Sequence, residues 1–376
     1  MSRPVELAKV TLAALLAGCA EADLAVDEDG ALASAWLEVG ATQFEGDGES
    51  GRVTIAAQAP LAALALRITT APGVCFQLSG AVDGAGRTVI DGRSAGSFCR
   101  DCELRTSVAV EAGVFVLPVE SGRFAPDTGA SLRFARVDCQ TLTPLSTPDD
   151  RPPLRIDAQP VEVVPERATI DLRFHVADSS ILFGDDDRQR ELIALLEQEL
   201  AASGVAPRLV ESRELEEIPA TLRFHAGDVS ELAAAFAGAP PKDETTVDVV
   251  FGGCLLYDDP VFGPPRAVNG FTPRIPGGAG PADGVFMPGL DCFAEGAGPV
   301  DIPLGAQARV LAHELGHYLG LYHAVEADGL ADPLDDTDAD NIMNPRTELA
   351  GSLGFSPSQG RVMRTHPAVR AAEGPR

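Results

Sequence analysis

Three histidines and a glutamate lie close together in the C-terminal half of the 376-residue chain. The segment that carries them reads His313-Glu314-Leu315-Gly316-His317-Tyr318-Leu319-Gly320-Leu321-Tyr322-His323. Positions i and i+4 of a helix lie one turn apart on the same face, so the imidazoles of His313 and His317 can bind one metal ion. Gly320 can end such a helix in the left-handed conformation, and the chain can then turn to bring in His323 as a third ligand.

Three imidazoles around one ion leave its fourth coordination position open, which is the pattern of catalytic zinc. Water bound there has its pKa lowered to about 7. Glu314 neighbours a ligand without being one, so it is placed to take the proton of that water and to return a proton to a leaving amine. An amphipathic helix with surface histidines is the alternative, but the added spacing of Gly320 and His323 favours a metal site. The pattern predicts one catalytic Zn2+ held by His313, His317 and His323, with Glu314 as general base.

These residues resemble the metzincin signature, HExxHxxGxxH followed downstream by a methionine turn. Twenty residues after His323, the chain reads Asn341-Ile342-Met343-Asn344-Pro345. By this resemblance, Met343 forms a hydrophobic floor beneath the three imidazoles without binding the metal. The resemblance also implies a catalytic domain with a mixed sheet and long helices that hydrolyses peptide bonds in a protein or peptide substrate.

Among metzincins, the pappalysin-like proteins are slightly favoured, because Phe355-Ser356-Pro357-Ser358-Gln359 resembles the start of their last helix. Two positions depart from known subfamilies. Ala324 follows the third histidine, where pappalysins usually carry Thr. No Tyr follows Met343 within two residues, so the extra tyrosine ligand of astacin-like and serralysin-like members is not expected. The resemblance covers roughly residues 168 to 370 and is specific only from 310 to 346.

The elements that must position these residues follow from the apolar spacing of residues 168–376. Strand-like and helix-like segments alternate there, which favours an α/β (α+β) metzincin-like domain with a mixed sheet. We expect strands over 170–174, 222–224, 246–251 and 284–287, and helices over 185–200, 229–237, 304–319 and 356–366.

Residues 19–140 are expected to form a domain of a different kind. Short apolar runs separated by Gly, Asp and Pro favour an all-β, sandwich-like domain. It contains no His, so nothing in it predicts catalysis, and it is expected to be an accessory domain or a prodomain. Six prolines among polar residues predict that residues 141–167 form a stiff linker.

The N-terminus has the pattern of an export signal. Arg3 and Lys9 flank a short apolar run that ends in Leu16-Ala17-Gly18-Cys19. This tetrad resembles the bacterial lipobox, with an ordinary signal peptide as the alternative. Residues 1–18 would then be a lipoprotein signal peptide and Cys19 the lipidated residue. The resemblance implies a protein of the bacterial cell envelope that meets the membrane only through its N-terminal lipid.

Six further cysteines support export. An even number in an exported chain favours three disulfides, with pairing inside each domain. Cys99 and Cys102 have CxxC spacing, so metal or redox chemistry is an alternative, and so is latency through a prosegment thiol that occupies the open zinc position. The six are Cys75, Cys99, Cys102, Cys139, Cys254 and Cys292.

Acidic residues dominate the charge of the chain. The net charge of -27 argues against a nucleic-acid partner, because such a surface repels phosphates. Six aspartates lie between the third histidine and Met343, and Ca2+, which prefers several oxygen ligands, would fit them. A solvated acidic loop is the alternative. These residues are Asp328, Asp332, Asp335, Asp336, Asp338 and Asp340.

The function that these patterns predict is that of a zinc-dependent metalloendopeptidase. One alternative is a catalytically inert or latent envelope protein that uses the β-sandwich domain for binding or adhesion to an unknown partner. Another is a zinc hydrolase that acts on a non-peptide substrate, such as a peptidoglycan-linked amide.

Overall fold

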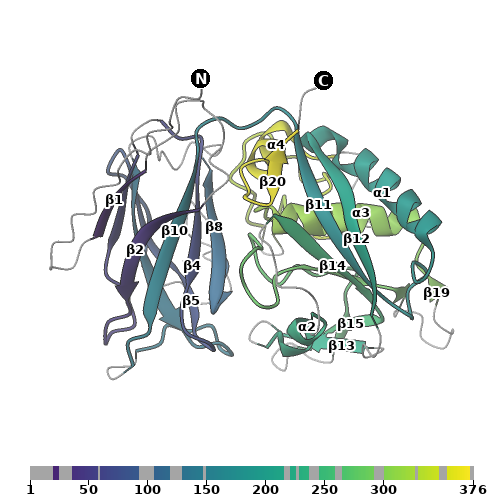
Figure 1. The fold of residues 1–376 in the computed structure, drawn as a ribbon, viewed down its shortest axis with the longest axis horizontal. Helices are drawn as coiled ribbons and strands as arrows, with labels where there is room; N and C mark the ends of the chain where they lie inside the picture. The colour runs from purple at the N-terminus through teal and green to yellow at the C-terminus, as the bar shows by residue number, and fades with distance from the viewer. Residues whose placement is uncertain are drawn as a thin grey trace, which may run out of the picture.

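The computed structural model describes two bodies that lie side by side, an all-β domain and a mixed α/β domain (Figure 1). The predicted signal peptide and Cys19 lie outside the described residues. No helix in the described part of the chain is long and apolar enough to cross a membrane. The structure describes residues 20–24, 36–57, 60–92, 106–118, 129–146, 150–215, 221–225, 228–236, 245–258, 265–291, 300–326, 329–346 and 354–372.

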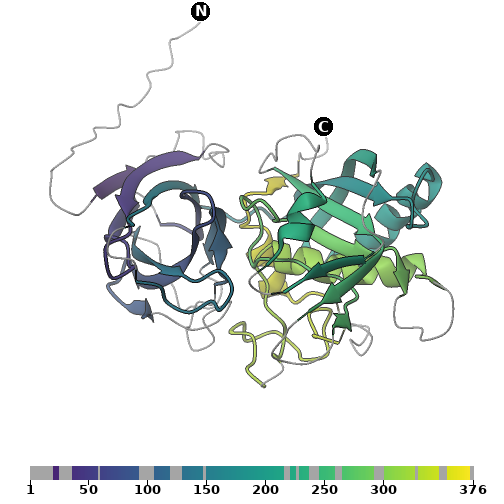
Figure 2. The same cartoon turned by 90° about the horizontal axis from the view of Figure 1, so that it is seen from below.

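The strands of the first body form one sheet in the order β1-β3-β9-β5-β7-β8-β4-β10-β2, with β6 on β5. Figure 2 shows this sheet curled into a ring around a core that includes Phe76, Phe115 and Phe134. The all-β prediction holds, but a single curled sheet replaces the two packed sheets of the predicted sandwich. Alternation identifies the buried face of a strand and does not say which strand edges pair. The strands are β1 (Ala20–Leu24), β2 (Leu37–Gln43), β3 (Val53–Ala57), β4 (Ala63–Thr69), β5 (Cys75–Asp83), β6 (Thr88–Asp91), β7 (Ala109–Val110), β8 (Ala112–Pro118), β9 (Gly129–Val137) and β10 (Pro153–Val161).

Strand β10 corrects the linker prediction. It lies within 141–167, yet it pairs with β4 on one side and β2 on the other. Leu154, Ile156 and Ala158 are buried in the β-domain core. The two prolines of the strand are tolerated because Pro153 begins it and Pro160 lies beyond its last pair with β2. Only residues 162–167 connect β10 to the next strand.

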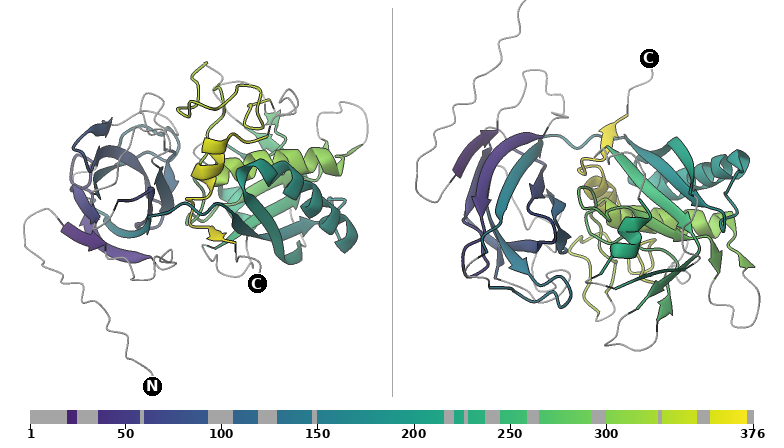
Figure 3. Two further views of the ribbon diagram at one scale, coloured as in Figure 1. Left: turned by 90° about the horizontal axis from the view of Figure 1, so that it is seen from above. Right: turned by 60° about the horizontal axis from the view of Figure 1, so that its bottom comes forward.

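The second body is built on a mixed sheet, as predicted. Its order is β12-β11-β14-β17, all parallel, with β20 antiparallel to β11. The helices α1 and α3 pack against each other and share the core of the sheet. Figures 1 and 3 show α4 and β20 on the side that faces the β domain. These elements are β11 (Ala168–Ala177), α1 (Asp186–Leu200), η2 (Ala201–Ser203), β12 (Val205–Leu215), β14 (Thr246–Gly252), β17 (Val285–Pro288), α3 (Leu304–Tyr318), α4 (Pro357–Met363) and β20 (Val369–Ala371).

A smaller layer lies below this sheet in Figure 1 and has its own apolar cluster around Leu222, Phe224 and Phe286. Its three-stranded sheet has the order β13-β15-β16. The layer contains β13 (Thr221–Phe224), α2 (Ser230–Ala234), β15 (Cys254–Tyr257) and β16 (Arg266–Ala267), and a separate ribbon is formed by β18 (Leu290–Asp291) and β19 (Val300–Asp301).

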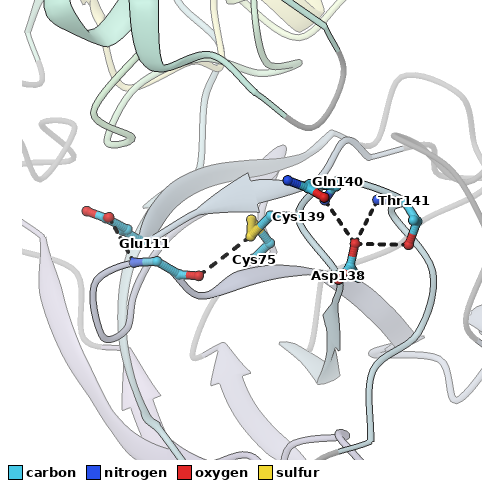
Figure 4. Close-up of a disulfide and its surroundings, with 7 residues drawn as sticks. Cys75, Glu111, Asp138, Cys139, Gln140 and Thr141 are labelled. Atoms are coloured by element: carbon cyan, nitrogen blue, oxygen red, sulfur yellow. Dashed lines mark hydrogen bonds between the residues drawn. A yellow bond between two sulfur atoms is a disulfide. The ribbon is translucent and has the colours of Figure 1, made fainter. Parts of the chain in front are cut away.

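One disulfide joins Cys75, at the start of β5, to Cys139, just after β9 (Figure 4). The turn that follows is held by Asp138, whose carboxylate accepts hydrogen bonds from the backbone N–H groups of Gln140 and Thr141. This pair fits the expected pairing within domains. Cys254 is also disulfide-bonded. The remaining cysteines of the prediction, Cys99, Cys102 and Cys292, lie outside the described residues.

Candidate metal centre

Helix α3 carries the first two histidines, and the local sequence explains where it ends. Its buried Leu311 and Leu315 lie in the core of the domain, one turn apart. Gly320 follows the helix with φ +103°, a conformation that L side chains rarely adopt. The helix therefore stops where the sequence predicts, and the chain turns towards the third histidine.

The three imidazoles surround a common point. One ligand atom from each of His313, His317 and His323 lies within 4.8 Å of the others. The Nε2 atoms of His317 and His323 are 3.2 Å apart. His313 and His317 are buried, and His323 is half-buried. The structure thus brings together the three predicted ligands, from α3 and from the loop after it.

Each imidazole has its outer nitrogen fixed by an oxygen atom. The Nδ1 atom of His313 donates to the carbonyl of Ile342, and that of His317 donates to the carbonyl of Leu321, each over 2.8 Å. Carbonyl oxygens can only accept, so these contacts place the proton on Nδ1 and leave Nε2 free to bind a metal ion.

The third histidine is held by a carboxylate instead. Its Nδ1 atom lies 3.1 Å from Oε2 of Glu326, which accepts the hydrogen bond. The Nε2 atoms of His317 and His323 face each other at 3.2 Å, and two such nitrogen lone pairs repel each other. A cation between them removes that repulsion, so the donor set fits a zinc ion.

Burial keeps His313 and His317 in the neutral form that a metal needs. It lowers the pKa of His313 to about 4, and the nearby His323 contributes further. Burial also lowers the pKa of His317 well below its ordinary value, with the neighbouring histidines as additional causes. These two ligands are therefore neutral at neutral pH, with Nε2 free of a proton.

Glu314 is buried beside the ligands. Burial raises the pKa of its carboxyl to about 7, although a hydrogen bond from Thr272 acts in the opposite direction. The Thr272 hydroxyl lies 2.8 Å from Oε2 of Glu314 and 2.9 Å from its backbone oxygen. Gly270 packs on the same side chain, since a Cβ there would lie 2.8 Å from Cγ of Glu314. A carboxyl group with a pKa near neutrality can both accept and release a proton.

The three histidines and Glu314 line a cavity of 590 Å³. Tyr322 lines it on the side of α3, and the smaller layer supplies His225, Val229 and Tyr257. The volume is within the range of small-molecule sites, so the cavity can hold part of an extended substrate.

Met343 lies against the ligand helix. It is fully buried, and a Cβ added to Gly316, which stands between the two helical ligands, would lie 2.6 Å from its sulfur. The carbonyl of Ile342, the residue before it, accepts from His313, and the carbonyl of Met343 accepts from the N–H of Ala324. The predicted methionine turn thus packs beneath α3 and connects two of the ligands.

Three of the aspartates in the acidic loop accept hydrogen bonds from nearby groups of the chain. Asp336 accepts hydrogen bonds from the hydroxyl of Ser356 and the N–H of Ser358, at the start of α4. Asp332 and Asp338 accept from N–H groups two residues further on. Within the described ranges, no group of three acidic side chains converges as the histidines do, and Asp328 lies outside them. The calcium site stays a prediction.

Sequence reasoning missed the residues that support the metal centre. Glu326 stands three positions after a ligand, and that spacing could have identified it. Thr272 and Gly270 carry no comparable signal, because they lie 42 and 44 residues before Glu314 and reach it only through the fold.

Comparison with known proteins yields distant structural neighbours only. No protein-family profile matches the chain, and no curated sequence is significantly similar to it. Archaemetzincin from Methanopyrus kandleri is 18% identical over 55% of this chain and 91% of its own, with a TM-score of 0.27. Metalloproteinase-II from Bacteroides fragilis is 10% identical over 86% and 93%, with a TM-score of 0.33. A family two carbohydrate esterase from Clostridium thermocellum is 9% identical over 56% and 60%, with a TM-score of 0.16.

Similarities at this level do not assign the chain to a family. The site itself combines three histidines that could hold a metal ion with a buried glutamate, in a mixed α/β domain, and this arrangement can do the chemistry of a metal-dependent hydrolase.

Proposed function

We propose that this protein is a zinc-dependent metalloendopeptidase of the metzincin type, with a protein or peptide as its substrate. The observation that carries the proposal is the pairing of three histidines, each with Nδ1 held by an oxygen, with a buried Glu314 on the same helix. An inert scaffold that only binds a partner would have no need of this arrangement. The pappalysin-like subfamily and an anchor through Cys19 stay predictions.

The residues of the chain divide the chemistry between them. His313, His317 and His323 would hold zinc, which when bound supplies Lewis acidity to water and to the substrate carbonyl. Glu314 accepts the proton that the attacking water loses and later donates a proton to the nitrogen of the leaving amine. Thr272 keeps the carboxylate oriented for both transfers through its hydrogen bond to Oε2.

The test measures zinc content and hydrolysis of a denatured protein such as casein, with the full chain and its Glu314→Gln variant. We expect about one zinc in both proteins and a loss of at least about a thousandfold in kcat for the variant. Glu197→Gln, which changes an exposed glutamate on α1, is the matched control and should retain full activity. Equal hydrolysis by Glu314→Gln and the unsubstituted protein would refute the proposal, as would a zinc-loaded protein that cleaves no peptide bond.

A further inference from the structure

One loop of the α/β domain, residues 270–279, contacts both the general base and the β domain. We call it the bridging loop. At its beginning, Gly270 and Thr272 hold Glu314 in place. Phe271, between them, exchanges two backbone hydrogen bonds of 2.9 Å with Phe286 of β17. The first part of the loop is thus attached to the sheet and to α3.

The middle of the bridging loop is held by Ser107 of the β domain. The Ser107 hydroxyl accepts a hydrogen bond from the N–H of Ile275 over 2.8 Å and donates one to its carbonyl over 2.9 Å. The N–H of Ser107 also donates to that carbonyl over 3.3 Å. Ser107 is buried, and both it and Ile275 line the 590 Å³ cavity that contains the histidines.

The neighbouring Arg274 packs against the β domain. Its guanidinium lies 4.5 Å from the centre of the Phe115 ring and donates to the carbonyl of Pro276 over 2.7 Å. A Cβ added to Gly113 on β8 would lie 2.6 Å from the same guanidinium. The loop and the β domain are therefore packed against each other as closely as residues inside a single domain.

The end of the loop returns to helix α3. The N–H of Gly277 donates to the carbonyl of Tyr318 over 2.9 Å, and the Tyr318 ring leaves no room for a side chain at Gly277. Gly278 packs against Val114 of β8 in the same way, since a Cβ there would lie 2.6 Å from Cγ2 of Val114. The loop is therefore clamped between α3 and the β domain along most of its length.

We propose that Ser107 is a positioning residue for Glu314 and that the β domain is a working part of the active site, an inference that rests on the proposed function. Without the hydroxyl, the backbone N–H of Ile275 loses its partner, and Ser107 keeps only the longer bond from its own N–H to the Ile275 carbonyl. Thr272, three residues away, then holds Glu314 less firmly. A prodomain that must leave before catalysis would have no such role.

The test compares Ser107→Ala with Ser50→Ala in the full chain. Ser50 is a matched control, because its hydroxyl also bonds backbone groups, accepting from Phe134 and donating to Gly51, but entirely within the β domain. We expect Ser107→Ala to lower kcat about tenfold, which is about 1.4 kcal/mol of barrier. KM should stay within about twofold and zinc content should not change. Equal kcat values in the two variants would overturn the inference.

A second measurement does not depend on activity. Amide hydrogen exchange reports on the N–H groups of Phe271 and Gly277, which bond only to the α/β domain. Both should exchange faster in Ser107→Ala than in Ser50→Ala. Unchanged exchange would overturn the inference even if Glu314→Gln abolishes hydrolysis. If the unsubstituted protein cleaves nothing, the proposed function fails, and so does the role of Ser107 in positioning the general base. Faster exchange in Ser107→Ala would still show that the bridging loop is coupled to the β domain.

Discussion

Replacing Glu314 by Gln is expected to stabilise the zinc-free protein above neutral pH. Burial raises the pKa of this carboxyl from 4.5 to about 7, because the charged form is poorly solvated in its pocket. Above pH 7 the folded protein must therefore accommodate a buried charge that Gln lacks. Gln has nearly the same shape, and its side-chain oxygen can still accept the hydrogen bond of Thr272.

The size and the pH range of the effect follow from the two pKa values. A shift from 4.5 to about 7 corresponds to about 3 kcal/mol, since each unit is worth about 1.4 kcal/mol. A raised pKa adds stability that is fully present below pH 4.5 and is lost as the pH rises through 7. The difference between Glu314→Gln and the unsubstituted protein should thus be near zero at about pH 4 and approach about 3 kcal/mol above about pH 8.

Denaturant unfolding of the chelator-treated proteins, followed by the helical circular dichroism signal, is the assay. All helices in the described residues belong to the α/β domain, so this signal reports on the domain that contains Glu314. Comparing the two proteins at each pH removes the contribution of every other titrating group. A stability difference that does not change between about pH 4 and about pH 8.5 would refute the burial argument.

Three further perturbations test the surroundings of the metal centre. Glu326→Ala should weaken zinc binding about 10- to 100-fold in a chelator competition, because His323 loses the acceptor that orients it, while Glu326→Gln should retain most of the affinity. Gly316→Val should destabilise the protein by roughly 1–3 kcal/mol in thermal unfolding, because the new side chain overlaps the sulfur of Met343. Thr272→Val should lower kcat about tenfold with unchanged zinc content, because it removes the hydroxyl that orients the general base; an unaltered kcat would exclude that role.

The parts of the site that could be predicted are those encoded by short-range spacing. His313 and His317 are one helical turn apart, and the left-handed Gly320 brings His323 to them within a few residues. Met343 could be predicted only through the resemblance of its segment to a methionine turn. For the three histidines, the distance along the chain is short, so a local pattern is sufficient.

The parts that escaped prediction depend on long-range packing. Ser107 and Ile275 are 168 residues apart, and no periodicity relates them. Strand β10 was missed for a different reason: its prolines indicate a linker, while the buried alternation of Leu154, Ile156 and Ala158 indicates a strand. In this strand, the free energy gained by burying the apolar side chains exceeds the cost of the N–H groups that proline lacks. The cost is small because both prolines lie where the strand pairs with a neighbour on one side only.

The groups that hold the three histidines and Glu314 in place differ in whether a substitution can remove them. The carbonyls of Ile342 and Leu321 belong to the backbone, so no side-chain substitution removes them, and they fix two ligands as long as the fold is intact. Only His323 depends on a side chain, that of Glu326, and this third ligand is also the most exposed. Glu314 is held by side-chain and loop contacts whose other end reaches the β domain through Ile275. The metal site is therefore built into the α/β domain, whereas the position of the general base depends on both domains.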